Sequence, residues 1–183
     1  VGEDPAGQVL RSMLTAIGAP QTGLATVTRC TTRKTRVVAR AQQMLRFDEE
    51  VDTDLEEAEI GGLLQLLDAA LARSDALVLE DYNKGVLVAP VIRSAIDWAR
   101  DRGIPVVVDP KYRNFFAFRG ATIFKPNRRE LESALGAEVD LDHPEALPAT
   151  FERLGVEHLL LTLGERGMAL IARDGEIGRI PTT

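Results

Sequence analysis

The chain has 183 residues, of which 45% are hydrophobic and 27% are charged, a composition typical of one globular domain with a sizeable core. No apolar stretch approaches the roughly 20 residues of a membrane span, and the single cysteine excludes a disulfide within the chain. The net charge of −6 argues against general nucleic-acid binding, which depends on neutralising phosphates. We therefore expect a cytoplasmic protein without membrane or nucleic-acid partners.

The first predicted element is a helix from Asp4 to Ile17. Asp4 suits the N-cap, Pro5 suits the first helical position, and Gly18 suits the end of the helix. Apolar residues recur along it at helical spacing: Val9, Leu10, Met13, Leu14 and Ile17.

Residues 26–47 are predicted to be β structure, and most of them form a basic stretch. Residues 29–47 contain six basic residues and no acid, whereas residues 48–59 contain eight acids and no base. If residues 35–47 formed one unbroken strand, odd positions would make an apolar face and even positions a basic face. That basic face would carry Arg36, Arg40, Gln42 and Arg46. A hairpin turn near residues 40–42 would alter this parity, and the sequence leaves both arrangements open.

Four short apolar runs each end abruptly in a polar cluster. The runs are Ala76–Leu79, Pro105–Val108, Ala121–Phe124 and His158–Leu161, and the clusters are Glu80–Gly85, Asp109–Lys111, Lys125–Glu130 and Thr162–Gly167. Helical patterns precede or separate them at residues 55–73 (interrupted by Gly61 and Gly62), 86–102, 127–135 and part of 143–154, and two strands follow at 168–172 and 176–180. Such alternation predicts an α/β fold with a mostly parallel sheet, in which ligands bind at the carboxyl ends of the strands.

The cluster Lys125–Glu130 has two interpretations of about equal weight. Asn127 suits a helix N-cap after Pro126, and Glu130 stands where the acid of a capping box would stand. The same helix N-terminus would present free amides and a partial positive charge to a phosphate. Glu130 would then be placed to hold a magnesium-bound water.

The cluster Thr162–Gly167 also has two interpretations. Its paired glycines permit close approach of the backbone to a ligand, and a tight turn would look the same. Neither the dinucleotide-binding fingerprint nor the P-loop motif occurs in the chain. An acid and a base also stand together in Asp81–Gly85 and in Asp109–Lys111. Because these clusters follow neighbouring strands, they favour a shared anionic ligand over isolated surface ion pairs.

Taken in order, the motifs DYNKG, DPK, KPN-x-x-E and T-x-G-x-x-G resemble those of the ribokinase-like (PfkB) carbohydrate kinases. The stretch K-x-R-x-x-x-R-x-Q-Q-x-x-R-x-D at residues 34–48, with DPK-x-R-N-F and RGAT, resembles the D-glycero-β-D-manno-heptose-7-phosphate kinases among them. The resemblance covers nearly all 183 residues. It implies a three-layer, ribokinase-like (Rossmann-like) α/β fold with a small β lid. Residues 1–183 would then form a single incomplete kinase domain, with residues 24–50 as part of the lid.

The resemblance also implies roles for individual residues. The nucleotide, ATP or ADP with Mg²⁺, would lie against Asn127, Arg128, Arg129, Glu130, Thr162, Gly164 and Gly167. The sugar phosphate would lie towards Arg36, Arg40, Gln42, Arg46 and Lys111. Guanidinium groups bind phosphate bidentately, which gives the arginines a physical purpose. Family members are often dimers through the lid, so a homodimer is expected here.

Two family elements are expected outside the sequence, namely a G-G-x-x-x-N segment before it and a G-A-G-D segment after it. The second supplies the general base, so no catalytic residue is assigned within residues 1–183, and this chain alone is expected to be nearly inert. The expected activity of the parent protein is phosphorylation of a sugar phosphate, at C1 of heptose 7-phosphate. The alternatives are a kinase of the same fold for another sugar or a nucleoside, and a non-catalytic nucleotide-binding module.

Overall fold

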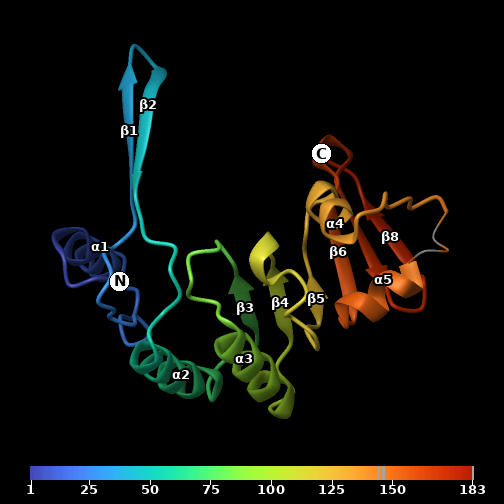
Figure 1. The fold of residues 1–183 in the computed structure, drawn as a ribbon, viewed down its shortest axis with the longest axis horizontal. Helices are drawn as coiled ribbons and strands as arrows, with labels where there is room; N and C mark the ends of the chain where they lie inside the picture. Colours follow the sequence, from blue (N-terminus) through green and yellow to red (C-terminus); the bar gives the residue numbers. More distant parts are fainter. Residues whose placement is uncertain (144, 146, 183) are drawn as a thin grey trace. The chain divides into compact units, whose positions relative to one another are not determined.

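The computed structural model describes residues 1–143, 145 and 147–182. The chain forms two compact units, Val1–Ala70 and Leu71–Thr183 (Figure 1). Within the described residues, no helix is both long and apolar enough to cross a membrane. The single incomplete domain over residues 1–183 stays a prediction.

The first unit contains two helices and a hairpin. Its elements are α1 (Pro5–Ala16), β1 (Arg33–Ala39), β2 (Gln42–Glu49) and α2 (Glu57–Leu71), whose last residue belongs to the second unit. Helix α2 runs without a break through Gly61 and Gly62, so the predicted interruption was wrong. Glycine lowers helix propensity by only about 1 kcal/mol per residue, and the leucine-rich turns on the C-terminal side continue the helix.

Helix α1 begins and ends as predicted. The Asp4 carboxylate caps it by accepting hydrogen bonds from the backbone N–H of Gly7 and of Thr31, both at 2.7 Å. These hydrogen bonds, that from Thr31 first, lower the pKa of Asp4 because they stabilise its charged form. Gly18 takes a φ of 69° just after the helix. The predicted apolar stripe is only partly covered, because Val9, Met13 and Ile17 are each more than half exposed.

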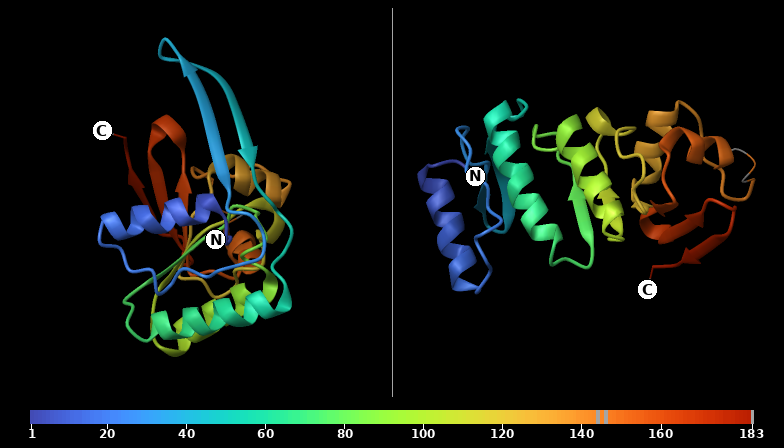
Figure 2. Two further views of the ribbon diagram at one scale, coloured as in Figure 1. Left: turned by 90° about the vertical axis from the view of Figure 1, so that its left-hand side faces the viewer. Right: turned by 90° about the horizontal axis from the view of Figure 1, so that it is seen from below.

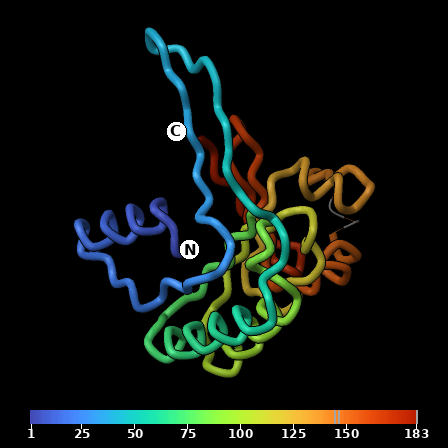
Figure 3. Tube along the Cα trace, turned by 60° about the vertical axis from the view of Figure 1, so that its left-hand side comes forward, coloured from blue at the N-terminus to red at the C-terminus, as the bar shows by residue number. Residues whose placement is uncertain are grey.

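Residues 33–49 form an antiparallel hairpin, the second of the two arrangements that the sequence allowed, whereas the β structure predicted for residues 26–32 was wrong because they form only an isolated bridge at Val27. Arg40 and Ala41 make its two-residue turn, with φ values of 49° and 66°. Two consecutive left-handed residues are the signature of a type I′ turn, whose twist matches that of the flanking strands. The two strands form a sheet of their own (Figures 2 and 3).

The register of the hairpin decides which side chains share a face. Arg36 lies opposite Arg46, so these two arginines are on one face, as the even-position pattern predicted. A β-bulge after Val37 then shifts the register, and Gln42 lies opposite Ala39. Gln42 is therefore on the apolar face and Arg40 is in the turn, because the turn and the extra residue of the bulge break the simple parity.

The second unit is an α/β structure with a six-stranded sheet. Its elements are β3 (Leu77–Glu80), α3 (Ala89–Asp101), β4 (Val106–Asp109), η1 (Tyr112–Asn114), β5 (Ile123–Phe124), α4 (Arg128–Leu135), α5 (Leu147–Leu154), β6 (His158–Thr162), η3 (Gly164–Arg166), β7 (Met168–Ala172) and β8 (Ile177–Ile180). The strands lie in chain order from β3 to β8. Pairs among β3, β4, β5 and β6 are parallel, whereas the last two pairs are antiparallel. The predicted strands and the mostly parallel sheet are confirmed; Pro144, in the helix expected at 143–154, lies outside the described residues.

One face of this sheet carries the main core. Leu79, Val108, Phe124, Leu159 and Ile171 lie side by side in register across five strands, and all are buried. Buried residues of α3, α4 and α5 join the same core, and they include Ile92, Ala95, Ile96, Leu131, Phe151 and Leu154. The opposite face is more open. This core fixes the strands, and with them the loops at their carboxyl ends.

Candidate functional site

The four polar clusters of the sequence meet at one edge of the six-stranded sheet. Strands β3, β4, β5 and β6 are parallel neighbours, so their carboxyl ends lie on the same side. An isolated parallel bridge between Asn127 and Thr162 continues the β5–β6 ladder beyond both strands, and the Thr162 N–H donates to the Pro126 carbonyl at 3.1 Å. The structure therefore brings the Lys125–Glu130 and Thr162–Gly167 clusters together, as the sequence predicted.

Charged side chains alternate in sign along this edge. Lys125 Nζ lies 3.0 Å from Asp109 Oδ2, and Lys111 Nζ lies 3.8 Å from Asp109 Oδ1. Lys111 Nζ also donates a hydrogen bond of 2.9 Å to Glu130 Oε1. The four side chains come from the ends of β4 and β5 and from the start of α4. Lys125 and Asp109 were not among the predicted binding residues, although both stand in the motifs that indicated the site.

Electrostatics keep the Lys111 ammonium charged. Partial burial lowers its pKa, but the hydrogen bond to Glu130 and the negative charges of Glu130 and Asp109 outweigh that effect. The net result is a raised pKa. Lys111 therefore remains positively charged among the strand-end loops.

The start of α4 is a complete capping box. The Asn127 side chain accepts from the Glu130 N–H at 2.9 Å, and the Asn127 N–H donates to Glu130 Oε2 at 2.8 Å. Both oxygens of Glu130 are therefore engaged, one by the cap and one by Lys111. The cap interpretation of this motif is correct, and the role in phosphate binding stays a prediction.

The two arginines after Asn127 have different surroundings. Arg128 donates to Glu132 at 2.9 Å and also to the Val139 carbonyl, and its hydrogen bond to Glu132 is the main cause of the lowered pKa of Glu132. Arg129 lines a hollow of about 500 Å³ between η1 and α4, together with Tyr112, Phe115, Phe116, Asn127, Glu130, Ser133 and Ala134. Arg128 thus has a structural task on α4, whereas Arg129 borders open space beside the cap.

The two glycines of the Thr162–Gly167 cluster have different reasons to be glycine. Gly167 has a φ of 82°, and a Cβ there would collide with the backbone of Ile180 and Pro181. Gly164 has a φ of 63°, but a Cβ there would meet nothing within 4 Å. The turn interpretation therefore accounts for both glycines through their positive φ, and the close backbone contact is a second reason at Gly167. The open space in front of Gly164 is available to a ligand.

A buried acid that the sequence interpretation missed joins two of the loops. Asp81 is only 3% exposed and follows β3 directly. Its carboxylate accepts from the Asn83 N–H at 2.7 Å and from Asn114 Nδ2 at 3.0 Å, and Asn114 Nδ2 also donates to the Leu87 carbonyl. The loop after β3 is thus tied to the η1 segment that follows Lys111. The acid in DYNKG was the available signal, but its burial could not be read from the sequence.

The hairpin residues form their own charged surface in the first unit. Lys34 pairs with Asp48 at 2.9 Å and with Glu50 at 3.0 Å, and Arg46 Nε lies 3.1 Å from Asp48. Arg36 forms no ion pair among the described residues, and it lies directly opposite Arg46. Like charges placed opposite each other repel, so an anion between them would be stabilising.

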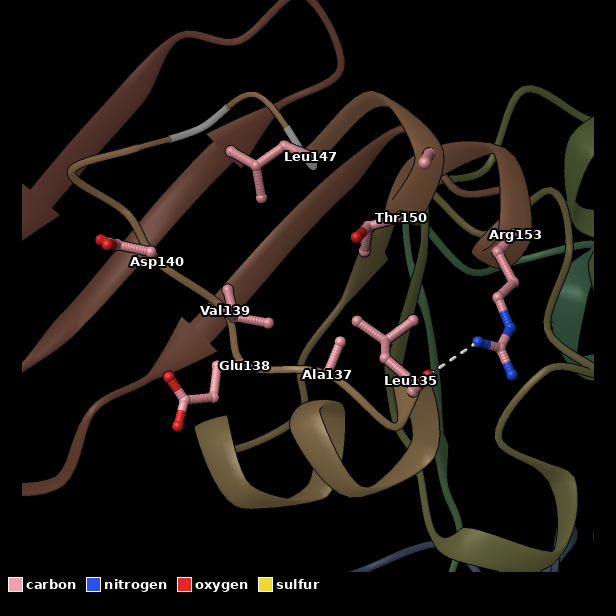
Figure 4. A pocket seen from close by; sticks show the side chains of 9 residues that line it. Leu135, Ala137, Glu138, Val139, Asp140, Leu147, Thr150 and Arg153 are labelled. Carbon is pink, nitrogen blue, oxygen red and sulfur yellow. Dashed lines mark hydrogen bonds between the residues drawn. The ribbon is translucent and has the colours of Figure 1, made fainter.

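A separate hollow of about 210 Å³ lies beside α4 and α5 (Figure 4). Leu135, Val139, Leu147 and Thr150 line it together with Ala137, Glu138, Asp140, Ala149 and Arg153. The Arg153 guanidinium donates to the Leu135 carbonyl at the end of α4. None of the predicted binding residues lines this hollow.

Comparison with known proteins identifies the family. A model of the pfkB family of carbohydrate kinases matches residues 1–182. The chain belongs to this family. It is 41% identical over 184 residues to the bifunctional protein HldE of Gluconacetobacter diazotrophicus, and the match covers 99% of the chain and 38% of that protein. The chain thus spans about two fifths of the length of this curated relative.

Solved structures of other proteins have the same fold as this chain. Ribokinase of Arabidopsis thaliana, complexed with ribose and ATP, matches with a TM-score of 0.67 at 16% identity, over 99% of this chain and 59% of that one. Phosphofructokinase-2 of Escherichia coli, in complex with fructose-6-phosphate, matches with a TM-score of 0.67 at 20% identity, over 99% and 60%. The predicted ribokinase-like α/β fold is confirmed.

We predict that the two glycines of the T-x-G-x-x-G motif differ in their cost of substitution. Gly164→Ala should lower the free energy of unfolding by about 1 kcal/mol, the cost of a left-handed alanine. Gly167→Ala should cost more than about 2 kcal/mol because it adds a clash with the backbone. Urea unfolding of the two variants measures the difference. Equal losses would show that the backbone beside Gly167 yields freely.

Proposed function

We propose that the protein is a kinase, or part of one, that transfers the γ-phosphoryl group of ATP to a sugar phosphate. The substrate proposed is D-glycero-β-D-manno-heptose 7-phosphate, and the acceptor is its C1 hydroxyl. The observation that carries the proposal is the meeting of four motif clusters at one edge of a parallel sheet, in a chain of the pfkB family. The similarity to HldE proteins supports the heptose.

The nucleotide is proposed to lie across the ends of β5 and β6. The N-terminus of α4 directs backbone N–H groups and its partial positive charge towards the phosphates. Arg129 and Lys125 would add cationic partners there, and the open space at Gly164 would let the backbone approach the nucleotide. In phosphoryl transfer, positioning and charge neutralisation supply most of the catalysis. The general base is assigned to no residue in the range 1–183.

Glu130 would hold the magnesium ion that accompanies ATP through a metal-bound water. Within the described residues, no three His, Cys, Asp or Glu side chains gather closely enough to enclose a metal ion. A single carboxylate suits a magnesium ion that keeps several waters and is held mainly by phosphates. The Lys111 ammonium lies 2.9 Å from Glu130 Oε1, so this oxygen already pairs with a cation. When bound, magnesium would neutralise charge on the transferred phosphate.

The sugar phosphate is proposed to be held by cationic side chains. Arg36 and Arg46 would receive its phosphate between them. The assignment of Lys111, in the second unit, to the sugar phosphate stays a prediction. Arg40 and Gln42 are weaker candidates, because one is in the turn and the other is on the apolar face.

An assay of ATP consumption by the parent protein tests the proposed function. We expect ADP release with heptose 7-phosphate that exceeds release with fructose 6-phosphate, ribose or a nucleoside. Turnover of another member of this panel instead would identify a kinase of the same fold with a different substrate. Tight ADP binding without turnover of any of these substrates would favour a nucleotide-binding module and would contradict the proposal.

We predict that Arg36→Gln raises the KM for the sugar phosphate roughly 10- to 100-fold, as expected for losing a charge-assisted phosphate contact. The KM for ATP should stay unchanged. The control is Arg33→Gln, on the same strand but the opposite face, where Arg33 already pairs with Glu49. Equal effects of the two substitutions would show that general charge, not a phosphate contact, is responsible.

We also propose that the hairpin forms a homodimer through its apolar face. Val37, Leu45 and Phe47 lie on that face, and each is 44–57% exposed. An isolated two-stranded hairpin is marginally stable in water, so this face gains from a partner. Sedimentation should show a dimer for the natural protein and a monomer for Leu45→Glu. A dimer that survives the substitution would place the interface elsewhere.

A further inference from the structure

The Lys111 ammonium lies between two carboxylates at the strand-end edge. It is 2.9 Å from Glu130 Oε1 and 3.8 Å from Asp109 Oδ1, while Lys125 takes the other oxygen of Asp109. The two cations and two anions form a chain of alternating charge that sums to zero. Lys111 thus already occupies the position on Glu130 that the proposed function gives to the metal and its water.

The Glu130 carboxylate is oriented by the capping box. Its Oε2 accepts a hydrogen bond of 2.8 Å from the Asn127 N–H, which favours the present direction of Oε1. The Lys111 and Glu130 side chains are only 35% and 27% exposed. Separating such a pair leaves both groups short of a partner, which is costly at partial burial.

Lys111 differs from Glu130 in its freedom to move. The segment that follows it is anchored, because the Arg113 N–H donates to Asn83 Oδ1 at 3.3 Å and Asn114 bonds the buried Asp81. The lysine side chain itself is a flexible four-carbon stem ending in a compact charge. Its ammonium can therefore move while the backbone beneath it stays in place.

We propose that Lys111 is a tethered cation that holds Glu130 in the free protein and leaves it when a divalent cation binds there. This inference rests on the proposed function. The released ammonium loses its closest anionic partner and becomes available to a phosphate group of the ligand. Divalent cation and phosphoanion therefore strengthen each other's binding, and by linkage the factor is the same in both directions. Lys111 is a positioning residue that exchanges one anion for another.

The test measures Mn²⁺ binding by electron paramagnetic resonance, with and without inorganic phosphate, in the natural protein and in Lys111→Met. Without its competitor, Lys111→Met should bind Mn²⁺ alone roughly tenfold more tightly, a typical coupling factor. Phosphate should also enhance Mn²⁺ binding less in Lys111→Met than in the natural protein. The enhancement that remains in the variant is the part due to direct contact between Mn²⁺ and phosphate. That direct contact is common to all variants and cancels in the comparison.

Two further variants make the result specific. Arg100→Met removes one positive charge from an exposed ion pair with Asp97 on α3 in the same unit, and should leave both Mn²⁺ affinity and coupling unchanged. Lys111→Arg keeps a cation beside Glu130 and should preserve weak Mn²⁺ binding, so it tests the inference even where Lys111→Met folds poorly. An unchanged or weaker Mn²⁺ affinity in Lys111→Met, or tight binding in Lys111→Arg, would overturn the proposal.

Failure of this inference can be distinguished from failure of the proposed function. Sugar-phosphate turnover by a protein whose Lys111→Met variant gains no Mn²⁺ affinity would overturn the tethered cation alone. Coupled binding of Mn²⁺ and phosphate without ATP turnover would overturn the kinase and leave the exchange at Glu130 standing. No Mn²⁺ binding by the natural protein, with or without phosphate, would overturn the tethered cation, and the assay of ATP consumption would then decide the kinase separately.

Discussion

The parallel pairing of β3, β4, β5 and β6 is the constraint on which the site depends. Because parallel neighbours end on the same side, each strand delivers its following residues to one edge. Strand β5 has only two residues, yet the Asn127–Thr162 bridge extends its pairing with β6 as far as the cap of α4. The four clusters are far apart in the sequence. Without this alignment of the strands they would not lie together in space.

The buried face of the sheet makes that alignment rigid. Phe124 is fully buried, and its ring meets Phe115 edge to face at 5.1 Å between centroids, which ties the loop after β4 to the core beneath β5. Asp81 and Asn114 add a hydrogen bond between neighbouring loops. Apolar packing below the edge and a few hydrogen bonds at the edge thus hold charged groups that would otherwise relax into solvent.

Charge at the site is balanced before any ligand is present. The chain Lys125–Asp109–Lys111–Glu130 satisfies its own members, and Asn127 fixes the final carboxylate. The hairpin differs, because Arg36 and Arg46 stand opposite each other and only Arg46 has an acid beside it. One surface is neutral without a ligand, whereas the other retains uncompensated positive charge.

Local patterns in the sequence determined the elements of this protein, whereas the contacts among them were decided by tertiary structure. Asp4, Gly18, Asn127 and Glu130 act through hydrogen bonds or dihedral angles within a few residues, so both ends of α1 and the start of α4 could be predicted correctly. The ion pair of Lys111 with Glu130, the burial of Asp81 and the shift of Gln42 to the apolar face could not. The position of Gln42 depends on the register of the two hairpin strands. The other two depend on partners that are 19 and 33 positions away in the chain. Such distances are set by how the whole sheet packs, and short-range spacing carries no record of them.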